Sequence, residues 1–487
     1  MSTSAPAATR DRTASNLRAT VATITGVLPS ASWASIAMPA ARSRSIEPTS
    51  PSRAASWSRR SVVMDAPPVV AGDCTDDGAP VAASHAAIMA MLITAQAIRP
   101  AHPIRMSAPI MLRAVTTDAR PRRNYLPADA PPIDLEGVVR LADFEAPARE
   151  RLHAAAWAYY AGGGYDEHVL ADTLAAWDAF RLRPRVLADV TGIDTTTTIL
   201  GRPASLPIGI APAALHGLAH RDGELATARG ATAAGAIHVV STVASHTIEE
   251  VAAAAPGGRR WFQLYVQRDR TVTRSLVERA AAAGYEALCL TVDLPVLGYR
   301  DEVLRLRFDP GVDAYANLPT RAVRRGDVAL DEMVDMRSVE LTWDDLGEIR
   351  SWAPIPLVLK GILTAEDARL AVEHGADAVW VSNHGGRQLD RVAAGIDVLE
   401  EVVDAVEGRA EVYLDGGIRR APEVLIALAL GARAVFTARP FLWALACAGE
   451  PGVTHAFAIL REELERGLAL MGVASPAGLT RAHVRRV

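Results

Sequence analysis

The sequence predicts an α/β fold, a (β/α)8 TIM barrel, on the strength of three observations. Eight short apolar runs alternate with amphipathic segments between about residues 206 and 439. Each run is rich in Val, Ile and Leu, as is typical of strands buried on both faces. The Gly-x-Gly-x-x-Gly fingerprint of dinucleotide-binding sheets is absent after the first run, and eight repeats favour a closed barrel over an open sheet.

The runs predict the barrel strands in chain order. They are Leu206–Pro212, Ile237–Thr242, Trp261–Val266, Ala287–Asp293, Pro356–Gly361, Ala378–Asn383, Glu411–Gly417 and Ala434–Arg439.

Helix boundaries between the runs are marked by threonines and glycines. A threonine three residues before an acid resembles a capping box, as at Thr247–Glu250, Thr342–Asp345 and Thr364–Asp367. A glycine that ends a helical segment is typical of a C-cap, as at Gly235, Gly284, Gly375 and Gly431.

Two irregular parts complete the predicted domain, which spans residues 131–487. A helical extension precedes the barrel and begins with a helix over Leu152–Tyr160. After the fourth strand a long polar loop runs from Arg300 to about Leu341. A loop of that length usually covers an active site or is mobile.

Residues 1–130 form a separate segment, rich in Ala, Ser, Pro and Arg and without sustained periodicity. Such a composition predicts a disordered or extraneous segment. It resembles an organelle transit peptide, and a mis-assigned start codon explains it equally well.

Composition excludes several classes of function. The net charge of −5 argues against a nucleic-acid partner, and no apolar run approaches the roughly 20 residues of a membrane span. The three cysteines, Cys74, Cys289 and Cys447, lack metal-ligand spacing, so no metal site is expected. Their number fits a reduced compartment, and we expect a cytoplasmic protein.

Lys360 is the single lysine among 51 basic residues. Arginine stands everywhere else, so a lysine that survives here suggests a need for a compact ammonium group. Chance survival is the alternative.

Polar groups follow six of the eight predicted strands, where a barrel of this type carries its active site. They are Gln263 and Tyr265, Thr291 and Asp293 with Arg300 after them, Lys360, Ser382, Asn383 and His384 with Arg387 after them, Asp415, Gly416 and Gly417 with Arg419 after them, and Arg439.

These groups divide into two sets by their chemistry. Gly416 and Gly417 with two arginines, Arg419 and Arg439, match a phosphate site after strands seven and eight, which suggests a phosphorylated cofactor. The second set mixes a base, an acid and two cations that suit a substrate carboxylate.

Residues 382–390, Ser-Asn-His-Gly-Gly-Arg-Gln-Leu-Asp, nearly reproduce the signature of the FMN-dependent α-hydroxy acid oxidase and dehydrogenase family. The resemblance runs from about Tyr159 to the carboxyl end. It also covers Tyr159–Gly163, Ile210–Pro212, Gln263–Tyr265, Thr291–Asp293, Leu359–Gly361 and Asp415–Arg419.

The resemblance implies a role for each matching residue. His384 is implied as the base that takes a substrate proton, Asp293 as the carboxylate that stabilises its imidazolium, and Lys360 as the cation beside the reduced flavin. Tyr265 is implied near the substrate hydroxyl, and Arg387, Arg300 and Tyr159 at the substrate carboxylate. The implied FMN contacts are Pro212, Ala213, Ala214, Ser241, Gln263, Thr291, Lys360, Ser382, Asp415, Gly416, Gly417, Arg419, Ala438 and Arg439.

The implied reaction is oxidation of a 2-hydroxy acid to the 2-oxo acid, with O2 or another acceptor and a homo-oligomeric, in this family tetrameric, assembly. Two residues depart from the family pattern. Val243 replaces a bulky tryptophan over the substrate in glycolate oxidase, which predicts a roomier pocket. Ala438 replaces a glycine near the phosphate, which predicts weaker FMN binding.

Two alternatives remain at this point. One is a type 2 isopentenyl diphosphate isomerase, which should lack the His384, Arg387 and Arg300 set. The other is a non-enzymatic flavin- or phosphate-binding barrel, against which every expected catalytic position is filled.

Overall fold

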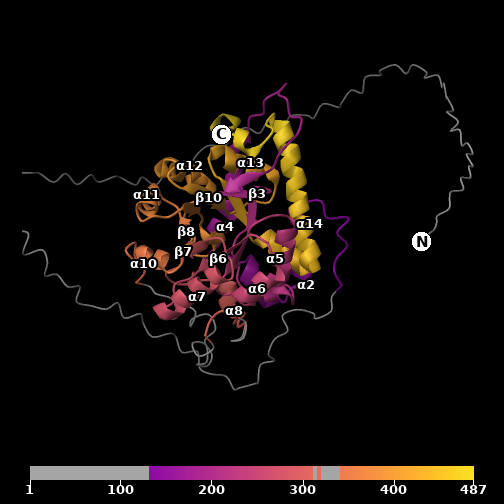
Figure 1. Cartoon of the computed structure of the whole chain (residues 1–487). Helices are drawn as coiled ribbons and strands as arrows, with labels where there is room; N and C mark the ends of the chain where they lie inside the picture. The colour runs from indigo at the N-terminus through magenta and orange to yellow at the C-terminus, as the bar shows by residue number, and fades with distance from the viewer. Residues whose placement is uncertain (1–130, 311–314, 320–339) are drawn as a thin grey trace, which may run out of the picture. The chain divides into compact units, whose positions relative to one another are not determined.

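The computed structural model describes residues 131–310, 315–319 and 340–487. The predicted segment 1–130 and most of the long loop after the fourth strand lie outside the described residues. Eight parallel strands close into a barrel in the order β10-β11-β4-β5-β6-β7-β8-β9 (Figure 1). The predicted (β/α)8 barrel is confirmed.

All eight predicted runs contain a strand. The strands are β4 Ile208–Ile210, β5 His238–Ser241, β6 Arg260–Leu264, β7 Leu288–Thr291, β8 Leu357–Ile362, β9 Ala378–Val381, β10 Glu411–Asp415 and β11 Ala434–Thr437. Only β6 and β8 extend beyond the predicted bounds, by one residue each, at Arg260 and Ile362.

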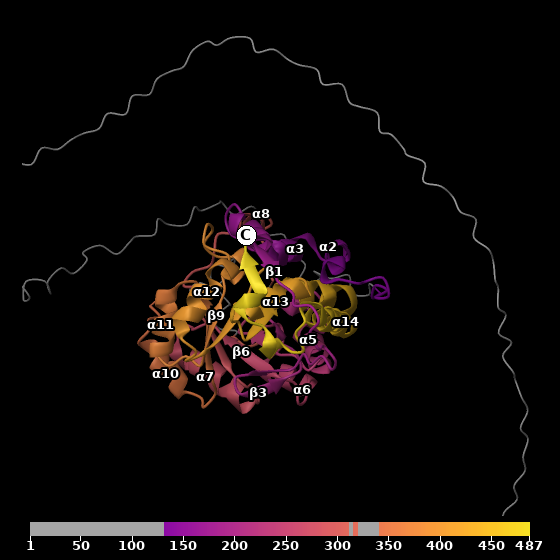
Figure 2. The same ribbon diagram turned by 90° about the horizontal axis from the view of Figure 1, so that it is seen from above.

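Helices surround the barrel, as the view from above shows (Figure 2). They are α5 Gly223–Ala233, α6 Ile248–Ala254, α7 Arg270–Ala282, α8 Asp301–Arg305, α10 Asp345–Ser351, α11 Ala365–Glu373, α12 Gly395–Val406, α13 Ala421–Leu430 and α14 Arg439–Met471. The long α14 is interrupted at Ala448 and Gly449, where the backbone leaves helical geometry.

The predicted helix boundaries are mostly confirmed. Thr247 and Glu250 form a full capping box, and Thr364 accepts a hydrogen bond from the Asp367 N–H. All four predicted cap glycines have positive φ. Thr342 does bond Asp345, but α10 begins at Asp345 with Asp344 as its N-cap, so the predicted N-cap is two residues early.

The amino-terminal extension is helical, but not as one helix. It forms α2 Glu145–Arg151, α3 Ala154–Ala161 and α4 His168–Ala175. The predicted helix over Leu152–Tyr160 is wrong at its start, because Leu152 has extended backbone and the His153 ring caps α3 from outside.

Two short sheets lie outside the barrel. β1 Phe180–Leu182 pairs with β12 Val484–Arg486, and β2 Thr197–Ile199 pairs with β3 Arg202–Ala204. The β2–β3 hairpin is tied to the barrel at the amino end of β10, where the Leu200 N–H donates to Glu411. No helix in the described ranges has the length and apolarity that a membrane crossing requires.

Four aromatic side chains fill the barrel interior below its carboxyl end. Trp261, Trp380, Tyr413 and Phe436 are fully buried, and the ring centroids of Trp380 and Phe436 lie 4.1 Å apart. Because this packed layer closes the interior, a cavity can form only above it, where the strands end.

Candidate active site

A cavity opens at the carboxyl ends of the barrel strands, with about 1110 Å³ of empty space including its open mouth. Every predicted site residue except Asp293 and Ser382 lines it. The lining residues are Tyr159, Pro212, Ala213, Ala214, Ser241, Gln263, Tyr265, Thr291, Arg300, Lys360, His384, Arg387, Asp415, Gly416, Gly417, Arg419, Ala438 and Arg439. Asp293 and Ser382 lie directly behind this lining, where they bond His384 and Lys360.

His384 and Asp293 form a hydrogen-bonded pair at the centre of the site. His384 Nδ1 lies 2.9 Å from Asp293 Oδ1, and His384 Nε2 lies 3.4 Å from the Tyr265 hydroxyl. His384 has a φ of 58°, a left-handed conformation imposed by the turn that follows β9. Asp293 follows β7 and His384 follows β9, with β8 between them, so three consecutive strands of the barrel must fold correctly to form the pair.

Burial and the neighbouring charges together set the charges of this pair. It lowers the pKa of His384 below its ordinary value, against the opposing influence of Asp293. Burial acts to raise the pKa of Asp293, but His384 and Lys360 outweigh it and hold that pKa below its usual range. The resting pair is therefore a neutral imidazole and a carboxylate, and the imidazole that donates from Nδ1 presents its Nε2 lone pair to the cavity.

Lys360 lies in β8, two residues before the end of the strand, lines the cavity and is 4% exposed. Its Nζ donates to Ser382 Oγ at 2.7 Å and lies 3.1 Å from Asp415 Oδ2. The same ammonium lies 5.6 Å from the centroid of the Trp380 ring. Burial alone would lower the pKa of Lys360, but the carboxylates of Asp415 and Asp293 raise it, so the side chain remains charged.

Arginine side chains crowd one side of the cavity. Arg387 donates to the carbonyls of Tyr160 and Gly162, and its guanidinium lies 5.2 Å from the Tyr159 ring centroid. Arg439 donates to the same two carbonyls and to the Gly385 carbonyl. Burial and the nearby charges of Arg387 and Arg419 lower the pKa of Arg439 to about 9, as expected for a crowded set of cations.

A chain of side-chain hydrogen bonds crosses the strand ends next to Lys360. Ser241 Oγ donates to Gln263 Oε1 at 3.1 Å, and Gln263 Nε2 donates to Thr291 Oγ1 at 3.0 Å. These three residues come from β5, β6 and β7, so the bonds fix the orientation of the Gln263 amide against the cavity.

The predicted phosphate end is assembled only in part. Gly416 and Gly417 have φ values of 100° and 76°, and this turn requires glycine because a Cβ on Gly417 would lie 2.3 Å from Trp177 Nε1. Arg419 turns toward the amino-terminal extension, where it forms an ion pair with Glu145 at 2.8 Å. Ala438 is the N-cap of α14 and lines the cavity.

Several cavity residues were not singled out by the sequence. Tyr160, Leu294 and Leu297 line the same space. Tyr160 belongs to the Tyr159–Gly163 motif, so the sequence could have indicated it as a cavity residue. The two leucines follow Asp293 in an irregular loop, and no periodicity distinguishes a lining side chain there from a surface one.

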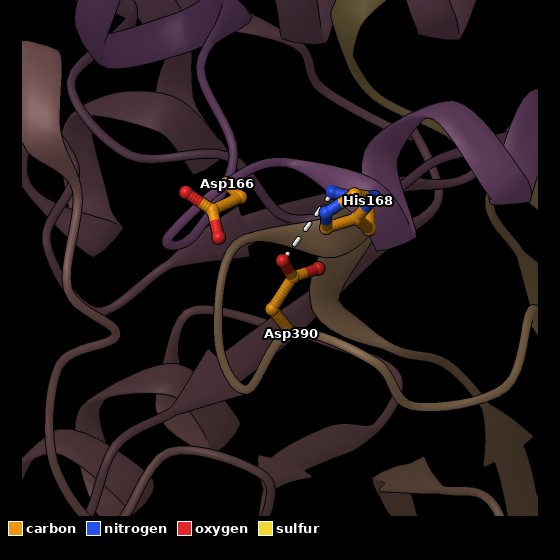
Figure 3. A group of neighbouring side chains, drawn as sticks. All are labelled: Asp166, His168 and Asp390. Atoms are coloured by element: carbon orange, nitrogen blue, oxygen red, sulfur yellow. Dashed lines mark hydrogen bonds between the residues drawn. The ribbon is translucent and has the colours of Figure 1, made fainter. Parts of the chain in front are cut away.

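One carboxylate–histidine group lies outside the cavity. Asp166, His168 and Asp390 place ligand atoms within 4.8 Å of one another (Figure 3). Asp390 already accepts from the N–H groups of His168 and Val169, at 3.3 and 2.8 Å. Its role in the structure is thus to cap the amino end of α4 and hold that helix against the turn after β9.

The order and chemistry of these residues match one family model. The model described as FMN-dependent dehydrogenase matches residues 148–486. The chain belongs to this family. As the sequence predicted, it is an FMN-dependent oxidoreductase that acts on the CH–OH group of 2-hydroxy acids.

The relatives of the chain include oxidases from distant organisms. The chain is 47% identical over 343 residues to 2-hydroxyacid oxidase 2 of Mus musculus, covering 70% of this chain and 96% of the relative. It is 48% identical over 345 residues to L-lactate oxidase of a Nostoc species, covering 69% and 94%. Among solved structures, a mandelate oxidase with (S)-4-hydroxymandelic acid matches with a TM-score of 0.68 and 42% identity, covering 72% of this chain and 99% of the other.

The residues present fit FMN. Its phosphate is an anion, and the cavity presents Arg419 and Arg439 on the side where the crowding of arginines lowers the pKa of Arg439. Its planar ring needs a cation near the atoms that gain charge and a polar edge for its ring nitrogens. Lys360 on β8 and the Gln263 amide on β6 offer these from either side of Thr291 on β7. An anion beside the arginines would offset their mutual repulsion.

Proposed function

We propose that the protein oxidises 2-hydroxy acids with long or aromatic side chains, and that His384 is the base. The observation that carries the proposal is the neutral His384 paired with Asp293 in a cavity that also holds Lys360, Arg300 and Arg387. The family membership gives the reaction class, and the geometry supports the role of each side chain.

Arg387 and Arg300 bind the substrate carboxylate in this proposal. Arg300 Nε donates to the Arg387 backbone carbonyl at 3.3 Å, and both residues line the same cavity as His384. A guanidinium can donate two parallel hydrogen bonds to a carboxylate, and two such groups fix the orientation of the α-carbon. Tyr159 packs against Arg387 and limits its movement.

His384 accepts a substrate proton at Nε2. Oxidation of the CH–OH group removes two electrons and two protons, and FMN, when bound, supplies the two-electron acceptor. The imidazolium that forms is stabilised by Asp293, because its carboxylate already accepts the Nδ1–H hydrogen bond. Tyr265 lies next to Nε2 and is placed to bond the substrate oxygen.

Lys360 provides the matching positive charge. Two electrons leave the substrate, so negative charge accumulates on the acceptor side of the cavity. A buried ammonium that is already fixed by Ser382 and Asp415 stabilises that charge without reorganisation. The same side chain would hold the ring end of FMN.

The substrate side chain is proposed to lie against an apolar wall. Val243 is buried beside the cavity, and Leu294 and Leu297 line it from the loop after β7. A valine at this place leaves room that a tryptophan would fill. Support also comes from the mandelate oxidase match, since mandelic acid is an aryl 2-hydroxy acid.

The test is anaerobic flavin bleaching with a panel of 2-hydroxy acids. The FMN-loaded protein should lose its visible flavin absorbance fastest with mandelate or a long-chain acid and slowest with glycolate. A protein that bleaches with none of them would contradict the proposed activity, and one that prefers glycolate would contradict the proposed pocket.

We also propose that O2 reoxidises the flavin and that the protein is cytoplasmic and homo-oligomeric. The matched relatives are named as oxidases, which supports O2 as the acceptor. Stopped-flow mixing of the reduced protein with O2 should restore the flavin absorbance within seconds. Restoration only by a quinone or cytochrome would make the protein a dehydrogenase.

A further inference from the structure

Glu224, on the first turn of α5, is fully buried and is absent from the cavity lining. Its Oε1 accepts from the N–H groups of His216 and Ser245, both at 2.9 Å. Its Oε2 lies 3.0 Å from His246 Nδ1. One carboxylate thus joins two loops, the one between β4 and α5 and the one between β5 and α6.

The carboxylate is charged in the folded protein. Burial acts to raise the pKa of Glu224, but the hydrogen bonds from His246 and the Ser245 N–H outweigh it and lower the pKa to about 2. The same contact raises the pKa of His246. The cost of removing two charges from water offsets much of the attraction in a buried ion pair. Such a pair therefore adds little to the free energy of folding, and its main effect is to fix the positions of the groups that it joins.

The strands that carry these two loops, β4 and β5, are paired over a short stretch. One residue pair, Ile210 with His238, connects β4 to β5, whereas β5 and β6 share four pairs. Above β4 and β5, the loops must therefore be held by other contacts. Glu224 supplies three of them, and the bond from Gly217 N–H to Ser245 Oγ at 3.0 Å supplies another.

Each loop carries residues of the cavity. Ala213 and Ala214 follow β4, and Val243 follows β5. The Leu215 N–H donates to the Val243 carbonyl at 3.1 Å, so a change in one loop is transmitted to the other. The Tyr160 hydroxyl, from another side of the cavity, donates to the Leu215 carbonyl.

The β5–α6 loop also holds residues 315–319, one of the described parts of the long loop. The Ala316 N–H donates to the Ala244 carbonyl at 3.1 Å. Asn317 accepts from the Ile248 N–H at 2.9 Å and donates to the His246 carbonyl at 3.2 Å. His246, the partner of Glu224, therefore lies between the Glu224 carboxylate and the segment 315–319.

We propose that Glu224 is a positioning residue that sets the separation of the β4–α5 and β5–α6 loops, and with it FMN affinity and the choice of substrate side chain. The inference rests on the proposed function, because it takes Ala213 and Ala214 as flavin contacts and Val243 as a substrate contact. Glu224 touches neither ligand and acts through the loops.

The test compares Glu224→Ala and Glu224→Gln with the wild-type protein. The Kd for FMN is measured by flavin fluorescence on the apoprotein, and the preference for mandelate over glycolate from kcat/KM. We expect Glu224→Ala to raise the Kd about tenfold or more, as for lost hydrogen bonds to a charged group, and to reduce the substrate preference. The flavin reduction rate at saturating substrate should change much less than KM. Glu224→Gln keeps an acceptor for the backbone N–H groups and should recover most of the affinity.

Glu411→Ala is the matched control, because Glu411 also accepts a backbone N–H and a side-chain donor, Tyr413 Oη, but at the opposite end of the barrel. It should lower the thermal midpoint without changing the Kd for FMN or the preference. If Glu224→Ala behaves like this control, the role is merely structural and the proposal is overturned.

A second variant covers the case in which Glu224→Ala does not fold. His246→Gln weakens the Oε2 contact and leaves both backbone contacts, so a raised FMN Kd with a nearly unchanged midpoint would support the proposal. An unchanged Kd would overturn it. Failure of the wild-type protein to bind FMN would instead contradict the proposed function, and is measured first.

Discussion

At the scale of single residues, charge governs the site. Lys360 is surrounded by Ser382, Asp415 and the Trp380 ring, all at distances that a compact ammonium can satisfy together. A guanidinium is wider and planar and cannot occupy the same space. Both the shape and the charge of its surroundings therefore favour lysine over arginine at position 360.

We predict that Lys360→Arg is not a conservative substitution. It should lower FMN occupancy and slow flavin reduction by roughly 10²–10³, which corresponds to ~2–4 kcal/mol of transition-state stabilisation. Lys360→Met should be slower still. Anaerobic stopped-flow reduction of the FMN-loaded variants measures the rate, and a Lys360→Arg rate close to wild type would mean that the lysine survived by chance.

The His384–Asp293 pair predicts a pH dependence. The neutral imidazole is the active form, so kcat/KM should be highest above the pKa of His384 and should fall as the pH drops through it. Because burial lowers that pKa, the fall should lie below the ordinary range of histidine. Asp293→Asn removes the influence that raises it, so the acidic limb should move to still lower pH.

The same variant should slow the reaction. Without the Asp293 carboxylate the imidazolium is less stable, and we expect a loss of roughly 10²-fold or more in kcat. The kcat/KM profile from pH 4 to 9 measures both effects. An acidic limb that does not move in Asp293→Asn would show that another group titrates.

At the scale of elements, an irregularity in β8 helps to position the His384–Asp293 pair. The register of β8 against β9 shifts between Lys360 and Ile362, and Gly361 between them has a φ of 112°. A Cβ on Gly361 would lie 2.6 Å from the Asp293 side chain and 2.9 Å from its backbone nitrogen. The absence of a side chain at Gly361 therefore allows Asp293 to lie close to β8.

Gly361→Ala should displace Asp293 from His384. We expect flavin reduction to slow by roughly 10²-fold, the cost of a misplacement of about 1 Å. Gly284→Ala is the control, because Gly284 also has a positive φ but open space where its Cβ would lie. Both variants should lose stability through backbone strain, and equal rates in the two would contradict the argument.

Val243, in the β5–α6 loop, lines the cavity, and we propose that it limits the size of the substrate pocket. Val243→Trp should fill the space beside Leu294 and Leu297, and so shift kcat/KM from aryl acids toward glycolate. A shift of about 10–200-fold corresponds to one or a few lost methylene contacts. Steady-state rates with mandelate, lactate and glycolate measure it. If the preference does not change, the loop from Arg300 to about Leu341, and not Val243, sets the pocket.

At the scale of the whole molecule, the matched family region begins at residue 148, and the relatives are covered almost completely by about 70% of this chain. We propose that residues 1–125 are dispensable. A chain that starts at residue 126 should keep its FMN affinity and lose less than ~1–2 kcal/mol of stability. Thermal unfolding and flavin titration of both chains test this, and a larger loss would refute it.

The strands and the site could be predicted because their signals are local. β4 to β11 are short runs buried on both faces. Lys360 and Asp415 lie near the carboxyl ends of such runs, and His384 comes shortly after one. Glu224 could not be predicted, because an acid in the first turn of a helix usually faces solvent near the helix amino end. Its burial depends on His216 and Ser245, which only the closed barrel brings to it.

The break between α2 and α3 could not be predicted from the sequence, for a related reason. Leu152 and His153 continue an alanine-rich helical pattern, and no proline or glycine marks the end of α2. The Thr342 start was misplaced because the threonine does bond Asp345, but the backbone turns into a helix only after that bond. Local hydrogen bonds alone do not fix where a helix begins.

The burial of Lys360 also gives the protein a built-in chemical reporter. Apart from the α-amino group, this side chain is the one primary amine in 487 residues, and it is 4% exposed. A reagent that acylates amines should therefore leave the barrel of the folded protein unmodified. Modification of Lys360, read as one mass increment on one peptide, would count the molecules whose barrel has opened.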